Sequence, residues 1–473
     1  MQQRRQLDEK QINRELLNGN LATPKWYYPV MGVLGVGVLI GFATILYMFN
    51  RGLGVTGLAR PVYWGLFITT FVFWVGISHA GIMISAILRL TQAEWRRPVT
   101  RAAELLTVFS LLTALFFPLM HAGRPWRIAY WLIPYDWARG IWPNVRSPLF
   151  WDPIAIGTYL TGSTLFLFVA LIPDLAILRD RTTGIKKTIY SMLALGWRGN
   201  PRQWQLQVVA GILLSALMLP IFVSVHSIVS WDFAVTPAVE GWHSTIFAPY
   251  FVIGAVHSGV SAVVTMMCLM RWLWKWNNYI RPEHFDALAR LLIIVATAWL
   301  AFTFLELIFS LYGRDAPEIA LRELQIFTWP WNLIFIAFLL TGYVIPVGCW
   351  LFKSCRNNIA IMFWTSILVN VGMWLERFLI IVPGLARKQV FVYTWEGYWP
   401  SPVEWVILVW SFAWVSFLML LFARFFPLVP FCEQYIANII KVTNHITYPV
   451  PRYSSITKPG MKIHCIQPDL PKS

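Results

Sequence analysis

The sequence contains few charged residues. Only 13% of its 473 residues are Asp, Glu, Lys or Arg, whereas 58% are hydrophobic and the mean hydropathy is +0.59. A soluble domain of this length needs more polar surface to cover its core, and a disordered chain contains far fewer apolar residues. Both classes are therefore excluded, and the composition predicts an integral membrane protein.

Cysteine is also scarce, and its spacing excludes common redox motifs. The five cysteines form neither a CxxC nor a CxxCH pattern. We therefore expect no iron–sulfur cluster and no covalently attached haem on this chain, and we predict no metal site. Residues 1–26 lack the short apolar core of a cleavable signal peptide and are predicted to form a cytoplasmic N-terminal segment.

Long apolar runs recur along the chain. Ten of them are long enough to cross roughly 30 Å of hydrocarbon as helices. The fold class predicted is all-α integral membrane, with ten transmembrane helices. Their expected limits are 27–50, 61–89, 102–120, 153–178, 205–230, 244–270, 287–312, 327–352, 358–383 and 403–426.

Basic residues are distributed unequally between the connections. If the ten spans alternate, 27 of the 38 Lys and Arg residues lie on the side of the N-terminus and 10 on the other, with Arg377 inside a span. Positive loops favour the cytoplasm, so we expect a multi-pass protein of the inner membrane with both termini cytoplasmic, including the tail 427–473. The net charge of +16 is explained by these loops and by lipid contact, and we expect no nucleic-acid partner.

Short motifs repeat after 178 to 184 residues. This spacing predicts two four-helix bundles that run parallel to each other, 61–230 and 244–383, with the flanking helices 27–50 and 403–426 outside them. The repeated pairs are His79 and His257, Arg97-Pro98 and Arg281-Pro282, and Thr161-Gly162 and Thr341-Gly342.

The longest outer connection, 121–152, is rich in Trp, Pro and Arg. Four Arg residues on this side depart from the usual charge bias, which favours a docking surface for a partner protein. A self-packed loop at the lipid headgroups explains the composition equally well.

Ionisable residues inside the spans are costly and need a reason. Two intramembrane histidines suggest a haem b site, but no His pair lies at matched depth, so we favour hydrogen bonds to neighbouring helices. Glu376-Arg377 is interpreted as an internal ion pair. Candidates for a proton path are Asp174, Glu306 and His257. The complete set of intramembrane groups is His79, Asp174, His226, His257, Glu306, Glu376 and Arg377.

His121 and Asp152 lie at the outer ends of adjacent spans. Asp152 precedes Pro153, a pattern typical of a helix N-cap, and His121 can be a loop histidine bonded to a carbonyl. Alternatively, an imidazole supported by a carboxylate accepts the two protons that quinol oxidation releases. The residues alone leave these interpretations level.

The segment His121-Ala122-Gly123-Arg124-Pro125-Trp126-Arg127 resembles the H-x-G-R-P motif of the NrfD/polysulfide reductase membrane subunits. Within that family, the ten-span architecture is most similar to the quinol-oxidising subunit of alternative complex III. The resemblance implies a menaquinol-oxidising subunit without its own redox metal, with His121 and Asp152 catalytic. It further implies that His79, Arg124 and Arg127 bind the quinol or contact the partner.

The same resemblance implies a set of partners. These are a periplasmic iron–sulfur subunit that receives the electrons, a second NrfD-like membrane subunit and c-type haem subunits, with proton translocation as a further expectation. Two alternatives remain open: a paralogous non-redox subunit that serves as proton path or anchor, and a quinone-reducing subunit of a polysulfide or nitrite reductase type of complex.

Overall fold

The computed structural model describes residues 23–59, 61–91, 97–126, 140, 145–146, 148–235, 239–242, 244–387 and 398–430. Within these residues, ten helices are long and apolar enough to cross a membrane, as predicted. The long helices are α3 (Tyr27–Arg51), α4 (Leu66–Ile82), α6 (Arg97–His121), α7 (Pro148–Arg181), α9 (Pro201–Ala234), α10 (Phe247–Leu273), α11 (Pro282–Gly313), α16 (Ile359–Ala386) and α17 (Pro402–Phe425).

Two of the ten spans contain a π-helical segment. The second span continues from α4 through Met83–Ile87 into α5 (Leu88–Leu90), and the eighth consists of α13 (Trp331–Leu339), Leu340–Val344 and α14 (Ile345–Trp350). Such single-turn widenings are rare and frequent at functional sites. Both lie in the spans that carry the repeated motifs His79 and Thr341-Gly342.

Short helices occupy connections that we expected to be loops. They are α8 (Ile185–Leu193), α12 (Ala316–Phe327) and α15 (Lys353–Arg356). Of these, α12 buries Leu321 and Gln325 and packs against α11, α13 and α16, so the connection 313–326 is part of the packed bundle.

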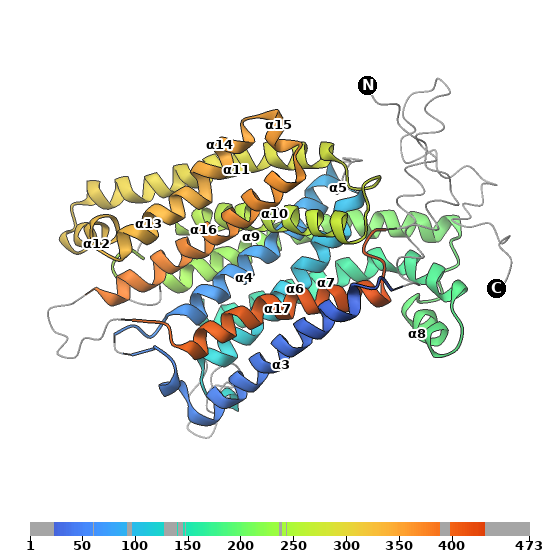
Figure 1. The fold of residues 1–473 in the computed structure, drawn as a ribbon, viewed down its shortest axis with the longest axis horizontal. Coiled ribbons are helices and arrows are strands. Elements are labelled where there is room, and N and C mark those ends of the chain that lie inside the picture. The colour runs from blue at the N-terminus through green and yellow to red at the C-terminus, as the bar shows by residue number, and fades with distance from the viewer. Residues whose placement is uncertain are drawn as a thin grey trace.

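Helices α4 and α10 lie at the centre of the molecule and pack against each other (Figure 1). In the most apolar stretch of α4, 82% of the residues are buried, compared with 17% for α3. Gly76 makes part of the contact possible, because a side chain there would crowd Ser258 of α10. Helices α3 and α17 pack side by side at one flank of this arrangement, as the predicted flanking positions require.

Helix starts follow the expected capping chemistry. Ser401 and Glu404 form a capping box at the start of α17, and Asn200 and Gln203 form one at α9. The carboxylate of Glu404 accepts three hydrogen bonds, from Gly57 N, Ser401 N and the hydroxyl of Tyr398. This fully buried group therefore joins the start of α17 to the connection after α3.

Candidate functional site

Helix α6 ends at His121 because of the two residues that follow. Ala122 N donates to Pro118 O at 3.0 Å, and Gly123 has a φ of +66°, the left-handed conformation typical of a residue that ends a helix. A side chain at Gly123 would also collide with Leu53, 2.7 Å away. His121 is thereby held half-buried at the end of α6, and its Nδ1 atom is buried without a hydrogen-bond partner among the described residues.

The predicted N-cap role of Asp152 is wrong. Helix α7 begins at Pro148, so Asp152 lies one turn inside it and the first described turn does not depend on its side chain. Proline is well tolerated as the first residue of a helix, and in α7 that residue is Pro148 rather than Pro153.

Asp152 instead faces Asp232, near the end of α9. The two carboxyl groups are within hydrogen-bonding reach of each other, and no donor from the described residues reaches Oδ1 of either. Two facing carboxyl groups form a hydrogen bond only when one of them carries a proton. We call Asp152 and Asp232 the carboxyl pair.

A repeated dipeptide in the sequence could have identified Asp232 as a partner of Asp152. Trp151-Asp152 and Trp231-Asp232 are the same dipeptide at the same end of consecutive spans. The two Trp rings lie 6.4 Å apart, so they place the two Asp residues on facing helices.

His121 and Asp152 lie at the same end of packed helices, but the expected support of the imidazole by a carboxylate is not formed at Nδ1, which has no partner among the described residues. Arg124 is exposed in the turn after α6. Arg127, with most of the connection 121–152, lies outside the described residues.

His79 lies deeper in α4 and is completely buried. Its Nδ1 lies 2.6 Å from Val75 O, and its Nε2 lies 2.9 Å from Phe222 O in α9. This confirms the expectation of a histidine bonded to a neighbouring helix. The side chain holds α4 against α9.

The prediction that no two histidines lie at matched depth is wrong. His79 and His226 meet with ring centroids 4.5 Å apart, because α4 and α9 are packed neighbours that run in opposite directions. The rings touch, and both nitrogens of His79 face carbonyl oxygens, so the pair is not arranged to hold a haem iron between them. Both nitrogens of His226 are buried without a partner among the described residues.

Of the three proton-path candidates, Asp174 forms a completely buried ion pair. Its carboxylate lies 3.0 Å from Nη2 of Arg101, which also donates to Ala170 O at 2.9 Å. Arg101 belongs to α6, whereas the expected span began one residue later. This pair lies at the opposite end of α7 from Asp152, so Asp174 is separated from the carboxyl pair along that helix.

The other two candidates lie in the second bundle. Glu306 pairs with Arg322 of α12 at 2.9 Å, and His257 lies 2.9 Å from Gly342 O. His79 lies within hydrogen-bonding distance of a carbonyl of the last helix of its bundle and His257 of one in the third helix of its own, so the hydrogen bonds of the two repeated histidines are not equivalent.

Arg377 of α16 interacts electrostatically with groups of both bundles. It forms the predicted ion pair with Glu376 at 3.2 Å and lies 4.5 Å from the ring centre of Phe251. It also interacts electrostatically with His79 and His226 in the first bundle. Arg377 is therefore a buried positive charge close enough to the histidine contact to act on it and paired with Glu376 in its own helix.

Comparison with known proteins agrees with this architecture. The family model described as "Polysulphide reductase, NrfD" matches residues 54–389, more than half of the chain. The matched range covers α4 to α16 and leaves α3 and α17 outside.

Three relatives cover most of the chain at low identity. A putative membrane subunit of a dimethyl sulfoxide reductase from Halobacterium salinarum is 23% identical over 76% of this chain and 78% of its own. An Hdr-like menaquinol oxidoreductase integral membrane subunit of Archaeoglobus fulgidus is 19% identical over 88% and 96%. A menaquinone reductase integral membrane subunit of Nitratidesulfovibrio vulgaris is 24% identical over 83% and 90%. The chain belongs to the NrfD polysulphide reductase family of multi-pass membrane subunits.

Proposed function

We propose that this chain binds and oxidises menaquinol as the integral membrane subunit of a redox complex of the alternative complex III type. The observation that carries the proposal is the carboxyl pair together with the unpartnered Nδ1 of His121 at the same end of the bundle, judged among the described residues. These groups are hydrogen-bond acceptors, and a hydroquinone supplies two hydroxyl donors.

The proton balance fits this site. Oxidation of a hydroquinone releases two electrons and two protons. His121 takes one proton at Nδ1, and the carboxyl pair, which already shares one proton, takes the other. The electrons leave to an iron–sulfur subunit docked over the connection 121–152, since the cysteines of this chain provide no cluster motif.

The comparisons support a quinone-interacting role. The names of two relatives contain menaquinol oxidoreductase and menaquinone reductase, and all three are membrane subunits named for reductase or oxidoreductase systems. We carry this over as a menaquinol substrate, with a periplasmic iron–sulfur subunit, a second NrfD-like subunit and c-type haem subunits as partners. In this proposal the protein lies in the inner membrane with both termini cytoplasmic.

Arg124 and Arg127 are proposed to contact the headgroup or the iron–sulfur partner. The exposure of Arg124 beside His121 suits either role. His79 is proposed to set the deep wall of the site through its contact with α9. These assignments predict that Arg124→Gln weakens substrate binding or subunit docking without unfolding the helices.

Proton translocation is proposed to involve Glu306, His257 and Asp174. Glu306 is also paired, with Arg322, but its Oε2 atom is buried and accepts no hydrogen bond among the described residues, which leaves an oxygen that can accept a proton. Asp174 is already neutralised by Arg101, which suits a structural pair as well as a relay.

The test of the redox proposal is His121→Ala in the intact complex reconstituted with menaquinol. Quinol oxidation should fall about 10²-fold or more, the size of a lost acid–base group, while the complex still assembles. Normal turnover would reject the assignment. Photoaffinity labelling by a quinone analogue near His121 separates this role from a non-redox anchor, for which labelling there should be absent during turnover.

A further inference from the structure

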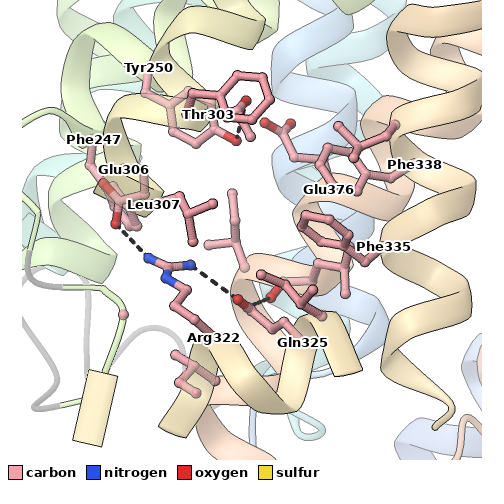
Figure 2. Close-up of a pocket in the computed structure, with 17 residues that line it drawn as sticks. Phe247, Tyr250, Thr303, Glu306, Leu307, Arg322, Gln325, Phe335, Phe338 and Glu376 are labelled. Carbon is pink, nitrogen blue, oxygen red and sulfur yellow. Dashed lines mark hydrogen bonds and ion pairs between the residues drawn. The ribbon is translucent and has the colours of Figure 1, made fainter. Parts of the chain in front are cut away.

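A pocket lies in the second bundle, between α10, α11, α12, α13 and α16 (Figure 2). It contains about 80 Å³ of space for water-sized atoms. By that measure one water needs roughly 10–15 Å³, so the pocket has room for several heavy atoms in a group.

Polar side chains enter the pocket at two levels. Tyr250, Thr303 and Glu376 form one level, where the Thr303 hydroxyl lies 3.4 Å from that of Tyr250. Glu306 and Arg322 belong to the other, beside α12 (Figure 2). Leu307 lies between the two levels. An occupant that spans the pocket therefore meets hydrogen-bonding groups at both ends and an apolar side chain in the middle.

Each level contains a carboxyl oxygen without a hydrogen bond. Glu376 is 2% exposed and Glu306 is 7% exposed, and Oε2 of each accepts no hydrogen bond among the described residues, although Oε2 of Glu376 lies 3.2 Å from Nη1 of Arg377 in their ion pair. The other oxygens are used: Trp299 Nε1 donates to Glu376 at 2.7 Å, and Arg322 donates to Glu306 at 2.9 Å. Buried polar atoms are rarely left in this state. The two Oε2 atoms thus favour an occupant that donates hydrogen bonds.

The two arginine side chains near the pocket already have partners. All three nitrogens of the Arg322 guanidinium donate, to Ser310, Gln325 and Glu306, at 2.9 to 3.2 Å. Arg377 is paired with Glu376. An anionic head such as a phosphate would meet two carboxylates and, among the described residues, no free positive charge, so the occupant is neutral.

The walls are aromatic, and the pocket is lined on one side by a lipid-facing residue. Phe247, Phe335 and Phe338 line it, the latter two with ring centroids 5.1 Å apart. Phe304 also lines it and is 50% exposed on α11, next to Ile308, which is 55% exposed. In a bilayer this face of α11 meets lipid tails, so an apolar molecule reaches the pocket from the membrane.

We propose that this pocket binds the head of a hydroquinone on an apolar tail, at a site separate from His121 and its carboxyl pair. In this proposal a flat aromatic ring lies against the phenylalanines of the wall, and its two hydroxyls point toward the two levels. The site is distinct from the proposed oxidation site because it lies in the second bundle and shares none of its residues.

The pocket should prefer the reduced form. A hydroquinone donates to both Oε2 atoms, whereas a quinone has only acceptor oxygens and would face the carboxylates without a hydrogen bond. Since two hydrogen bonds to charged acceptors are lost, we expect at least tenfold weaker binding of the quinone.

The experiment uses the intact complex in nanodiscs and a naphthohydroquinone with a diazirine on a short tail, kept reduced by dithionite. After illumination, peptide mass spectrometry should find label on residues 282–327. Unlabelled hydroquinone should displace it at concentrations at least tenfold lower than its dimethyl ether, which has the same ring but no donor hydroxyl and is not reduced by dithionite. Phosphatidylglycerol should not displace it.

Leu307→Trp and Ile308→Trp form a matched pair of variants. Leu307 lines the pocket and Ile308 faces lipid on the next position of the same helix. Label on 282–327 should be lost in Leu307→Trp and retained in Ile308→Trp. Label that is absent in the wild type, that persists in Leu307→Trp, or that phosphatidylglycerol displaces overturns the proposal.

A milder variant guards against misfolding of Leu307→Trp. Thr303→Val keeps the shape but removes the hydroxyl beside Tyr250, and it should weaken displacement by hydroquinone about threefold to tenfold. An unchanged value would contradict the role of this level. Label around His121 is read from different peptides, so failure of one site does not obscure the other.

Discussion

The carboxyl pair offers a sharp test, through Asp232→Asn alone and together with Asp152→Asn. Asn keeps the shape of Asp and donates a hydrogen bond to the remaining carboxylate, so the contact between α7 and α9 persists. What disappears is the second carboxyl group and the proton that the two share. Helix α7 starts at Pro148, so neither variant removes a helix cap.

The magnitude follows from the two groups acting as one proton acceptor. Loss of a positioned acid–base group lowers a rate by about 10²–10⁴-fold, and the retained carboxylate and His121 favour the low end. We expect each single variant to lower menaquinol oxidation about 10²-fold. Independent effects would multiply to about 10⁴-fold in the double variant, whereas a shared role predicts a loss close to that of either single variant.

The assay is steady-state quinol oxidation by the purified complex, with thermal unfolding and the presence of every subunit measured in parallel. Asp180→Asn is the control, because Asp180 is a 63% exposed carboxylate near the far end of the same α7. It should leave turnover unchanged. Wild-type activity of Asp232→Asn, or fully multiplicative losses in the double variant, would refute the shared-proton reasoning.

Three further variants test other parts of the structure. Burial, and then the neighbouring Glu404, raise the pKa of Tyr398 well above its usual range, so its hydroxyl donates a hydrogen bond at physiological pH. Tyr398→Phe should therefore lower the free energy of unfolding by about 1.5–3 kcal/mol, measured by chemical denaturation in detergent. An unchanged free energy would contradict a stabilising role of this hydrogen bond. Asp174→Asn should lower the free energy of unfolding by about 3–5 kcal/mol, because it leaves the buried Arg101 without its charged partner. Recovery of thermal stability in a double variant with Arg101→Met would confirm a structural ion pair. An unchanged stability of Asp174→Asn would exclude such a pair. Glu306→Gln in reconstituted vesicles should lower the ratio of protons moved to electrons transferred, and an unchanged ratio would remove this residue from the proton path.

The sequence predicted the helices better than their ends. Apolar length alone identified ten spans, because a membrane requires each crossing to satisfy its own backbone. Helix ends depend on local chemistry that competes between neighbours, as Pro148 and Pro153 do at the start of α7. The π-helical segments could not be predicted either, since they depend on how the second and eighth spans pack.

The sequence predicted candidate site residues one by one but not how they come together. His121 was identified by its position after a long apolar run and by a family motif, and both features are local in sequence. Asp232 became relevant only when α7 and α9 were seen to face each other. Depth along a span was also too coarse a measure to predict the contact between His79 and His226, which depends on where antiparallel helices cross.

Pairing, more than burial, separates the intramembrane charges into structural and functional candidates. The cost of burying a carboxylate is general, but the way in which the structure meets it differs between sites. Asp174 forms an ion pair with Arg101, which stabilises its charged form and leaves the carboxylate little capacity to exchange a proton. Among the described residues, Asp152 and Asp232 face only each other, whereas Glu306 is paired with Arg322 through one oxygen and accepts no hydrogen bond at the other. Because no positive charge among the described residues balances the carboxyl pair, we expect protonation and ligand binding to be coupled there.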